Sequence, residues 1–213
     1  MHIRPYENND RDAVRRICAD TADYGQPIER VFPGREWISD AVIEGYLRFY
    51  PDLVFVAEEA GSVAGYLTGC TDTRAYLRQY ARRLSPTLVG SFLWRGLFLR
   101  WTAWRFVVQL VRQARWHGRA WFPVLDAYPA HCHINLRADI SRGGVGTQLL
   151  TAYLDILRAK HVPGIHISTG TGPGKAFFAK HGFVTLATHP GMSRPQAPAP
   201  EVWIMGKTLT NPA

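Results

Sequence analysis

Side chains able to move protons gather in one short stretch of the second half of the chain, at Asp126, His131 and His133. A histidine titrates near neutral pH, so it can take a proton from an ammonium group directly or through water. His131 and His133 are two residues apart, and a strand would place both on one face. Two interpretations stay open for them: a general base, or strand histidines whose nitrogens bond to neighbouring groups.

Cys132 lies between the two histidines. It is a weaker candidate for an acyl-carrying nucleophile, since no recognised motif ties a base to it. The other cysteines, Cys18 and Cys70, are far away in the sequence, and the three together have no metal-binding or disulfide spacing. We therefore expect no metal site, and we expect a reducing location, the cytoplasm.

A glycine-rich turn follows, between an expected strand and an expected helix. Apolar residues alternate at Ile134 and Leu136, three glycines stand within 143–146, and apolar residues recur at helical spacing over 149–157. Free N–H groups and the helix dipole at such a helix start suit a phosphate group. The alternative is a plain tight loop. The turn has neither the Gly-Lys-Ser/Thr ending of nucleoside-triphosphate loops nor the spacing and early position of the dinucleotide fingerprint.

The composition sets the general class. With 213 residues, of which 46% are hydrophobic, the chain can bury one sizeable core, and we expect a single domain over residues 1–213. The net charge of +8 suits an anionic partner, such as a cofactor rich in phosphate. No nucleic-acid motif accompanies the basic residues, so we expect no nucleic-acid partner. The polar N-terminus does not resemble a signal peptide.

Elements of both kinds must surround the glycine-rich turn, which indicates an α/β chain. The expected elements are a strand at 2–5, a helix through 14–18, a loop at 20–35, a helix over 37–50, a hairpin of 53–58 and 63–71, the strand from 131, a helix at 144–161, a strand at 165–168, a helix at 175–181 and a strand pair at 183–188 and 202–209. The strands at 131 and 165 are expected to be parallel through a right-handed crossover.

The segment 73–125 is unusual in composition, because it holds ten arginines and five tryptophans but no Asp or Glu. A membrane span over 88–111 would bury Arg95, Arg100 and Arg105, so we expect no transmembrane segment. The segment predicts one or two amphipathic helices. They pack on the sheet with solvated arginines, cover the substrate side, form a homodimer contact or lie on a membrane surface.

Ser141-Arg142-Gly143-Gly144-Val145-Gly146 resembles the Q/R-x-x-G-x-G/A pyrophosphate loop of the GCN5-related N-acetyltransferases (GNAT), with Ser141 where Gln or Arg is usual. The second signature of that family resembles residues 171–183. Phe177 matches it, whereas Thr171 and Gly174 replace Asn and Ala. Phe178 stands where the family usually has the tyrosine that protonates the departing thiolate.

Most of the chain outside 73–125 also resembles a bacterial subgroup related to the acetyltransferase-like domain of protein O-GlcNAcase. The segments that carry this resemblance are IRPYENNDRDAVRRICADTAD, LVFVAEEAGSVAGYLTGCTDTRAY, YPAHCHINLRADISRGGVG and VPGIHI. The resemblance implies the GNAT fold, a mixed and mostly antiparallel sheet of about six to seven strands flanked by helices. Residues 73–125 would then be a helical insertion.

The resemblance further implies acetyl-CoA as cofactor and transfer of its acetyl group to a primary amine, on a small molecule or a peptide, by direct attack. The Leu136 N–H would bind the acetyl carbonyl. The catalytic candidates are His133, His131 and Asp126. The cofactor-binding residues would be Ile134, Leu136, Arg137, Ser141, Arg142, Gly143, Gly144, Val145, Gly146, Thr147, Thr171, Gly174, Phe177 and Phe178. The alternative is a weak or inactive acetyl-CoA-binding module.

Overall fold

A seven-stranded sheet forms the centre of the computed structural model, which describes residues 1–140, 144–192 and 199–209, with only the backbone for 114–121. The strand order is β1-β2-β3-β4-β5-β7-β6. All neighbouring pairs are antiparallel except β4 and β5. The strands are β1 His2–Pro5, β2 Phe55–Glu59, β3 Ser62–Cys70, β4 Ala130–Leu136, β5 Gly164–Thr169, β6 Val184–Pro190 and β7 Glu201–Thr208. The predicted mixed, mostly antiparallel sheet is confirmed.

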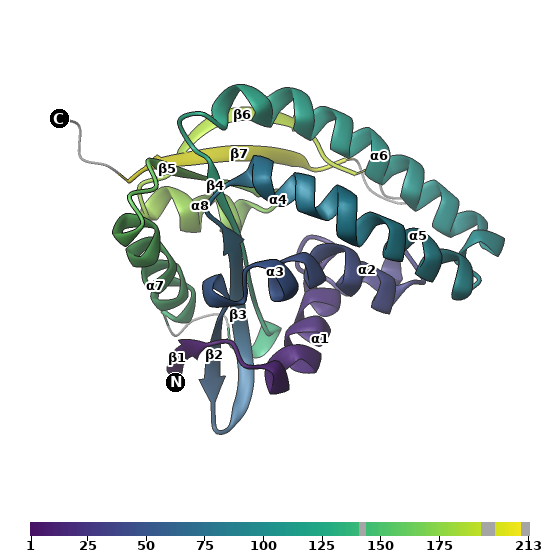
Figure 1. Cartoon of the computed structure of the whole chain (residues 1–213), viewed down its shortest axis with the longest axis horizontal. Helices are drawn as coiled ribbons and strands as arrows, with labels where there is room; N and C mark the ends of the chain where they lie inside the picture. The colour runs from purple at the N-terminus through teal and green to yellow at the C-terminus, as the bar shows by residue number, and fades with distance from the viewer. Residues whose placement is uncertain (141–143, 193–198, 210–213) are drawn as a thin grey trace.

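Helices cover both faces of the sheet (Figure 1). On one face, α7 buries Leu149, Leu150 and Tyr153 in a core shared with β2 to β5 and α8. On the other face, α1, α3 and α4 enclose a second core with β2 and β3. The helices outside residues 73–125 are α1 Arg11–Thr21, α2 Arg35–Val42, α3 Glu44–Phe49, α7 Val145–Ala159 and α8 Gly172–Lys180.

The predicted helix over 37–50 is two helices, because the chain bends at Ile43 between α2 and α3. Ile43 is itself fully buried, so the bend lets both helices direct apolar side chains inward. Pro51 begins a short 3₁₀ turn after α3, as its fixed φ and missing N–H favour.

The segment 73–125, called the insertion below, is helical as expected, although it forms three α-helices where one or two were expected. It consists of α4 Thr73–Gln79, a π-helical turn Tyr80–Leu84, α5 Ser85–Trp94, a 3₁₀ turn Leu97–Leu99, α6 Trp101–Trp121 and a 3₁₀ turn Phe122–Val124. Its apolar inner side packs on α2 in a third core, where the Trp37 indole N–H donates to the Leu88 carbonyl at 2.9 Å. No described helix is long and apolar enough to cross a bilayer.

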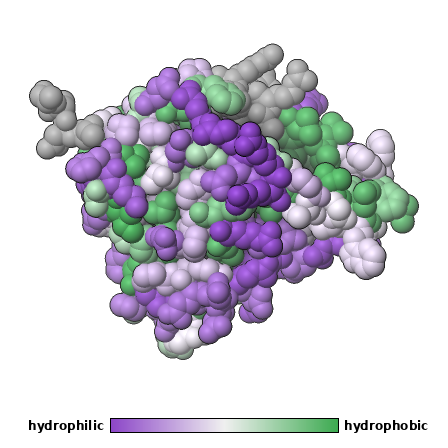
Figure 2. Space-filling view, in the orientation of Figure 1, coloured by the Kyte–Doolittle hydropathy of each residue, from purple (hydrophilic) through white to green (hydrophobic). Residues whose placement is uncertain are grey.

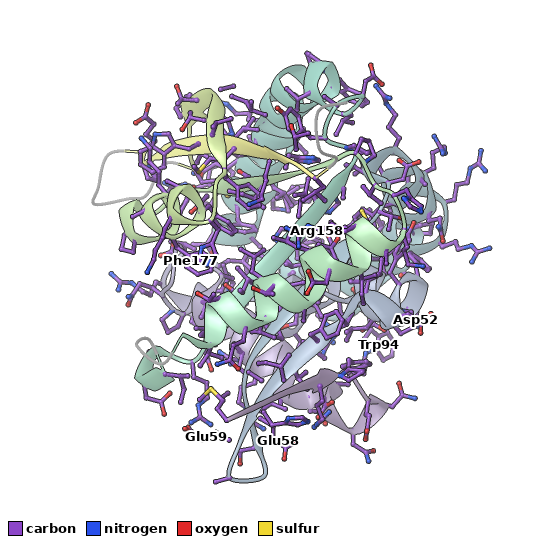
Figure 3. All side chains as sticks on the ribbon, turned by 90° about the vertical axis from the view of Figure 1, so that its left-hand side faces the viewer. Asp52, Glu58, Glu59, Trp94, Arg158 and Phe177 are labelled. Atoms are coloured by element: carbon purple, nitrogen blue, oxygen red, sulfur yellow. The ribbon has the colours of Figure 1, made fainter. Side chains whose placement is uncertain are left out.

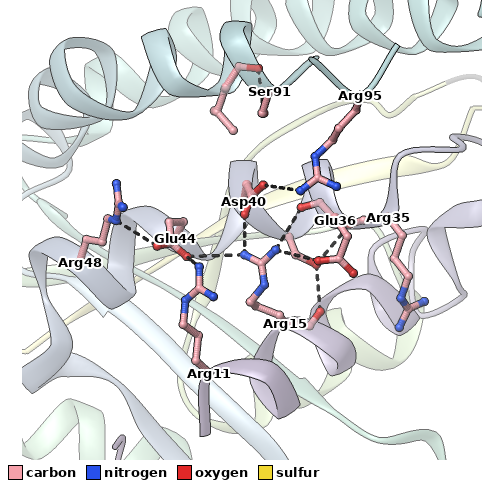
Figure 4. A network of polar contacts seen from close by, with 11 residues as sticks. Arg11, Arg15, Arg35, Glu36, Asp40, Glu44, Arg48, Ser91 and Arg95 are labelled. Carbon is pink, nitrogen blue, oxygen red and sulfur yellow. Dashed lines mark hydrogen bonds and ion pairs between the residues drawn. The ribbon is translucent and has the colours of Figure 1, made fainter. Parts of the chain in front are cut away.

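Charged side chains also join the helices on this side (Figure 4). The buried Arg15 guanidinium of α1 contacts Asp40 at 2.6 Å and Glu36 at 2.9 Å on α2, and Glu44 of α3 at 3.5 Å. Arg95, just after α5, reaches the other oxygen of Asp40 at 3.8 Å. The carboxylates share one side of each helix, so a single buried cation can connect three elements.

Candidate functional site

A cavity of about 1130 Å³ opens where β4 and β5 separate. The two strands pair only at Ala130–Ile165 and His131–His166, and beyond these positions no β4–β5 pairing is formed. The cavity lining includes Ile17 of α1 on one face of the sheet and Gly146 of α7 on the other. It therefore passes through the sheet, which only the separation of β4 and β5 allows.

The edge of β4 presents free backbone groups to this cavity. β4 pairs with β3 through six residue pairs, and the N–H of Arg137 donates to the Ala64 carbonyl of β3. In an antiparallel pair, every second residue of a strand bonds to the neighbouring strand through its N–H. Since Arg137 bonds to β3, the N–H groups of Ile134 and Leu136 point away from β3. Both residues line the cavity, and their backbone can pair with the amides and the carbonyl of an extended ligand.

The turn before α7 lies beside the cavity. Gly144 has φ +70° and caps the helix, a conformation that a residue without Cβ adopts at no steric cost. A Cβ on Gly146 would meet the Phe177 ring at 3.3 Å, so glycine keeps the space between α7 and α8 open. Figure 3 shows Phe177 on α8 near the start of α7. Ser141, Arg142 and Gly143 lie outside the described residues.

The remaining expected cofactor residues sit around this helix start. Arg137 lines the cavity while its guanidinium donates to Asp139 at 2.9 and 3.1 Å. Val145 is buried at the start of α7, and Thr147 contacts the His181 ring at 3.1 Å. Neither of them lines the cavity. The structure thus brings only part of the predicted cofactor-binding residues to the cavity, where the first turn of α7 contributes Gly146.

Helix α8 forms the far wall. The Thr171 hydroxyl accepts the Gly174 N–H at 3.1 Å and so caps α8, a role that the family's Asn can also fill. A Cβ on Gly174 would lie 2.3 Å from the Thr169 hydroxyl, so this residue has to be small. Phe177 and Phe178 line the cavity, with ring centroids 5.1 Å apart. Neither ring has a proton to donate.

Comparison with solved structures places this arrangement among known folds. The chain matches SsHAT at 27% identity, covering 99% of this chain and 98% of that one, with a TM-score of 0.74. It matches a GCN5-related N-acetyltransferase from Kribbella flavida at 12% identity, covering 97% of this chain and 96% of that one, with a TM-score of 0.59. It also matches yncA from Salmonella typhimurium with its cofactor acetyl-CoA at 15% identity, covering 100% of this chain and 96% of that one, with a TM-score of 0.57. The chain has the GNAT fold. No protein-family model matches the sequence.

Within this GNAT fold His131 belongs to the buried core. It is 5% exposed and does not line the cavity. Its Nε2 bonds to the Tyr46 hydroxyl, and its Nδ1 lies 2.7 Å from the Thr73 hydroxyl, whose own proton goes to the Pro129 carbonyl. Both ring nitrogens are thus engaged, and of the two interpretations the geometry favours a satisfied strand histidine over a general base.

Burial lowers the pKa of His131 well below its usual value, so the folded protein holds it neutral. The unfolded chain protonates this ring near pH 6.5, and the stability that His131 contributes is therefore lost as pH falls below that value. We expect the free energy of unfolding to fall by about 1.4 kcal/mol per pH unit for each such histidine.

Replacing His131 with leucine should remove one histidine's share of this acid sensitivity. It should also destabilise the protein at neutral pH by about 2–4 kcal/mol, since two buried hydroxyls lose a partner. Urea unfolding on either side of pH 6.5 measures both effects, with the exposed His2→Leu as control. An unchanged pH slope would contradict the assignment.

His133 differs from His131 because it lines the cavity and is only half-buried. Burial lowers its pKa to about 4, with His166 as a further cause. Its ring lies edge-on to Tyr46, with centroids 5.5 Å apart. At neutral pH it is an unprotonated imidazole facing the cavity, which can accept a hydrogen bond from an amine.

The structure does not bring the other proton-moving candidates to this point. The Asp126 side chain is 80% exposed and pairs with Arg74 at 2.5 Å, outside the cavity. Asp126 lies in the turn before β4, three residues ahead of Pro129, and the sequence alone did not reveal where this turn directs its side chain. Cys132 lines the cavity, but burial raises the pKa of its thiol far above neutrality, so it is no activated nucleophile.

Sequence reasoning missed the wall opposite α8. Tyr24 and Gln26 of the loop after α1, and Leu110 and Gln113 of α6, also line the cavity. Tyr24 has φ +51°, and its hydroxyl accepts the Met192 N–H at 3.0 Å. A loop and a distant helix meet here through the tertiary fold, so no local pattern in the sequence could have indicated them.

Proposed function

We propose that this protein is an acetyl-CoA-dependent N-acetyltransferase that transfers the acetyl group to a primary amine. One observation carries the proposal: a cavity passes through the sheet between β4 and β5, lined by the unpaired N–H groups of Ile134 and Leu136. Such a cavity can receive an extended thioester from one face and an amine from the other. The yncA neighbour, which shares this fold, was solved with its cofactor acetyl-CoA, and this supports acetyl-CoA as the ligand proposed here.

The residues present fit the cofactor. Gly146 and Gly174 leave room where a Cβ would collide, and the start of α7 offers free N–H groups and a positive dipole end for the diphosphate. We propose that Gly144, Val145 and Thr147, with Ser141, Arg142 and Gly143, surround the diphosphate, and that Arg137 and Thr171 border it. Phe177 and Phe178 would pack against the pantetheine arm.

Acetyl-CoA, when bound, supplies an acetyl group activated as a thioester. The Leu136 N–H would donate to the acetyl carbonyl oxygen and stabilise the negative charge that develops there. The neutral His133 ring would accept a hydrogen bond from the attacking amine and pass its proton to water. The new N–C bond would replace the thioester C–S bond, and the departing thiolate would take its proton from water, since Phe178 has none to donate. Because the pKa of His133 is about 4, this ring holds the proton only briefly.

Two measurements test the proposal on the full chain. Titration calorimetry with acetyl-CoA should show saturable binding, and a thiol-release assay over a panel of amines should show turnover with at least one acceptor. The absence of heat with acetyl-CoA and with coenzyme A would refute the proposal. Binding without turnover on any amine would instead support the second candidate, described next.

The second candidate is a module that binds acetyl-CoA with little or no turnover. It is favoured by Phe178, which is buried beside Phe183 at a centroid distance of 5.2 Å and offers no proton for the thiolate. Asp126 and His131, two of the three predicted catalytic residues, lie outside the cavity. Under this proposal the protein recognises the acyl-CoA rather than consuming it.

Replacing Phe178 with tyrosine should separate the two candidates. The new hydroxyl would face the cavity and could protonate the leaving thiolate, and we expect thiol release to rise about tenfold or more, within the usual range for a general acid. The control is Phe183→Tyr, a buried neighbour that does not line the cavity. No gain with Phe178→Tyr in a variant that still binds acetyl-CoA would argue against a missing acid.

We further propose that residues 1–213 act as one domain and that the chain belongs with the bacterial subgroup related to the acetyltransferase-like domain of protein O-GlcNAcase. Support for the subgroup comes from the segments around β1, β3, β4 and β5 that carry the resemblance. The three cysteines are free and buried, which supports work in a reducing location such as the cytoplasm.

A further inference from the structure

The outer side of α6 carries an exposed apolar stripe. Trp101, Trp104, Val108 and Val111 are all exposed and follow one another at steps of three or four residues, so they share one side of the helix. Ala103 and Phe106 on the inner side are buried in the core of the insertion. Large apolar side chains therefore lie on both the buried and the exposed side of α6.

The turn between α5 and α6 continues this stripe at the tip of the molecule. Trp94 is 91% exposed, Leu99 78% and Trp101 75%. In Figure 1 this turn lies at the far right end of the two helices, beyond the sheet. Figure 2 shows hydrophobic residues gathered on the same right-hand part of the surface. Large side chains so exposed mark a contact with another surface.

Arginines border the stripe. Arg105 and Arg112 lie four residues after Trp101 and Val108, so each is placed beside the stripe on α6, and Arg100 precedes the helix. Among the described side chains of the insertion, Arg74 and Arg95 pair with a carboxylate. For the other arginines with described side chains, the insertion itself offers no carboxylate, since it has no Asp or Glu.

We propose that the outer side of α6 and the α5–α6 turn dock on an anionic lipid bilayer. Tryptophan and leucine side chains would enter the interfacial layer, while the bordering arginines contact lipid phosphates. A bilayer that is apolar inside and negatively charged at its surface satisfies both sets of side chains at once. The cavity-lining residues Leu110 and Gln113 point away from the stripe by their helical spacing, so docking leaves the cavity open.

Charge complementarity decides among the occupants of this face. A second copy of the chain would bring the same arginines and no carboxylate of its insertion to the contact, so like charges would oppose each other. A nucleic acid would satisfy the arginines but would leave Trp94, Leu99 and the valines of α6 in water. The proposal does not depend on acetyl transfer, and its test does not use activity.

Vesicle sedimentation with the full chain tests the proposal. The probes are vesicles of phosphatidylcholine alone and of phosphatidylcholine with one part in three of phosphatidylglycerol. We expect binding to the anionic vesicles, a blue shift of tryptophan emission on binding, and release on raising the salt from about 0.1 M to about 1 M, which shortens the Debye length from about 10 Å to about 3 Å. Equal binding to both vesicles would overturn the charge argument.

Two variants identify the surface. Arg105→Gln with Arg112→Gln should weaken binding about fivefold per arginine, and Trp94→Ser with Trp101→Ser should weaken it about tenfold or more and remove the blue shift. Matched controls are Arg158→Gln on α7 and Val184→Ser on β6, both exposed and outside the insertion.

Three results would overturn the proposal: no binding of the wild type to anionic vesicles, unchanged binding of the double variants, or equally strong binding to duplex DNA. Light scattering measures the oligomeric state and so tests whether a second copy of the chain covers this face. A dimer that the tryptophan variant converts to a monomer, without vesicle binding, would assign this face to a second copy. Circular dichroism of every variant checks that the fold is retained.

Discussion

Replacing Gly146 with valine should raise the dissociation constant for acetyl-CoA at least about 100-fold, or about 2.7 kcal/mol. A Cβ at this position would already meet the Phe177 ring at 3.3 Å and Ile134 at 3.8 Å. The two further methyl carbons of valine would fill the space between the start of α7, α8 and β4. Valine is compatible with a helix, but it would also press on the Phe177 ring, so we expect a loss of about 1–3 kcal/mol in the free energy of unfolding beside the loss in binding.

The control for this substitution is Gly172→Ala in α8. A Cβ there meets nothing within 4 Å, so acetyl-CoA affinity should stay close to that of the wild type. Calorimetric titration of both variants measures the difference, and thermal unfolding confirms that both are folded. If Gly146→Val bound acetyl-CoA as tightly as Gly172→Ala, the cofactor would not lie beside α7 and the cavity assignment would be wrong.

The second large effect is expected from Leu136→Pro, which removes one backbone N–H from the cavity edge of β4. That N–H points away from β3, so the strand loses no bond of its β3 ladder. The residue before a proline prefers an extended backbone, which Asn135 already has in β4. Removing one donor to a developing oxyanion typically costs about 10²–10³ in kcat.

Leu136→Ala is the matched control, since it shortens the side chain but keeps the N–H. We expect its kcat to remain within about tenfold of the wild type, because only packing against α7 changes. Steady-state thiol release measures kcat for both variants, and calorimetry shows whether acetyl-CoA still binds. Equal losses in the two variants would assign the effect to packing and remove the carbonyl-binding role from Leu136.

The fold was predictable because its signals are local. Alternation in β4, the glycines before α7 and the apolar spacing within α7 each specify an element from a few neighbouring residues, and all three elements are present. The two-helix break at Ile43 was missed, since one apolar period runs through both helices. Whether α2 and α3 are one helix or two depends on the shape of the surface that they cover.

The candidate site was predictable along β4, at the start of α7 and on α8. His133, Leu136 and Phe177 line the cavity. These residues could be proposed in advance because sequence patterns had already located their strand and helix. Asp126 was misplaced, since nothing in the sequence indicates where a loop residue points. Tyr24 and Gln113 were missed for the same reason: they reach the cavity through packing between segments far apart in the chain.

The buried Arg15 and its carboxylates have one more consequence. Asp40 of α2 faces Arg15 of α1 with one oxygen and Arg95 of the insertion with the other. A shift of the insertion that keeps these ion pairs would therefore displace α2 and α1. Two residues of α1, Ile17 and Thr21, line the cavity. We expect these ion pairs to transmit a displacement of the insertion to α1, and through α1 to the cavity wall.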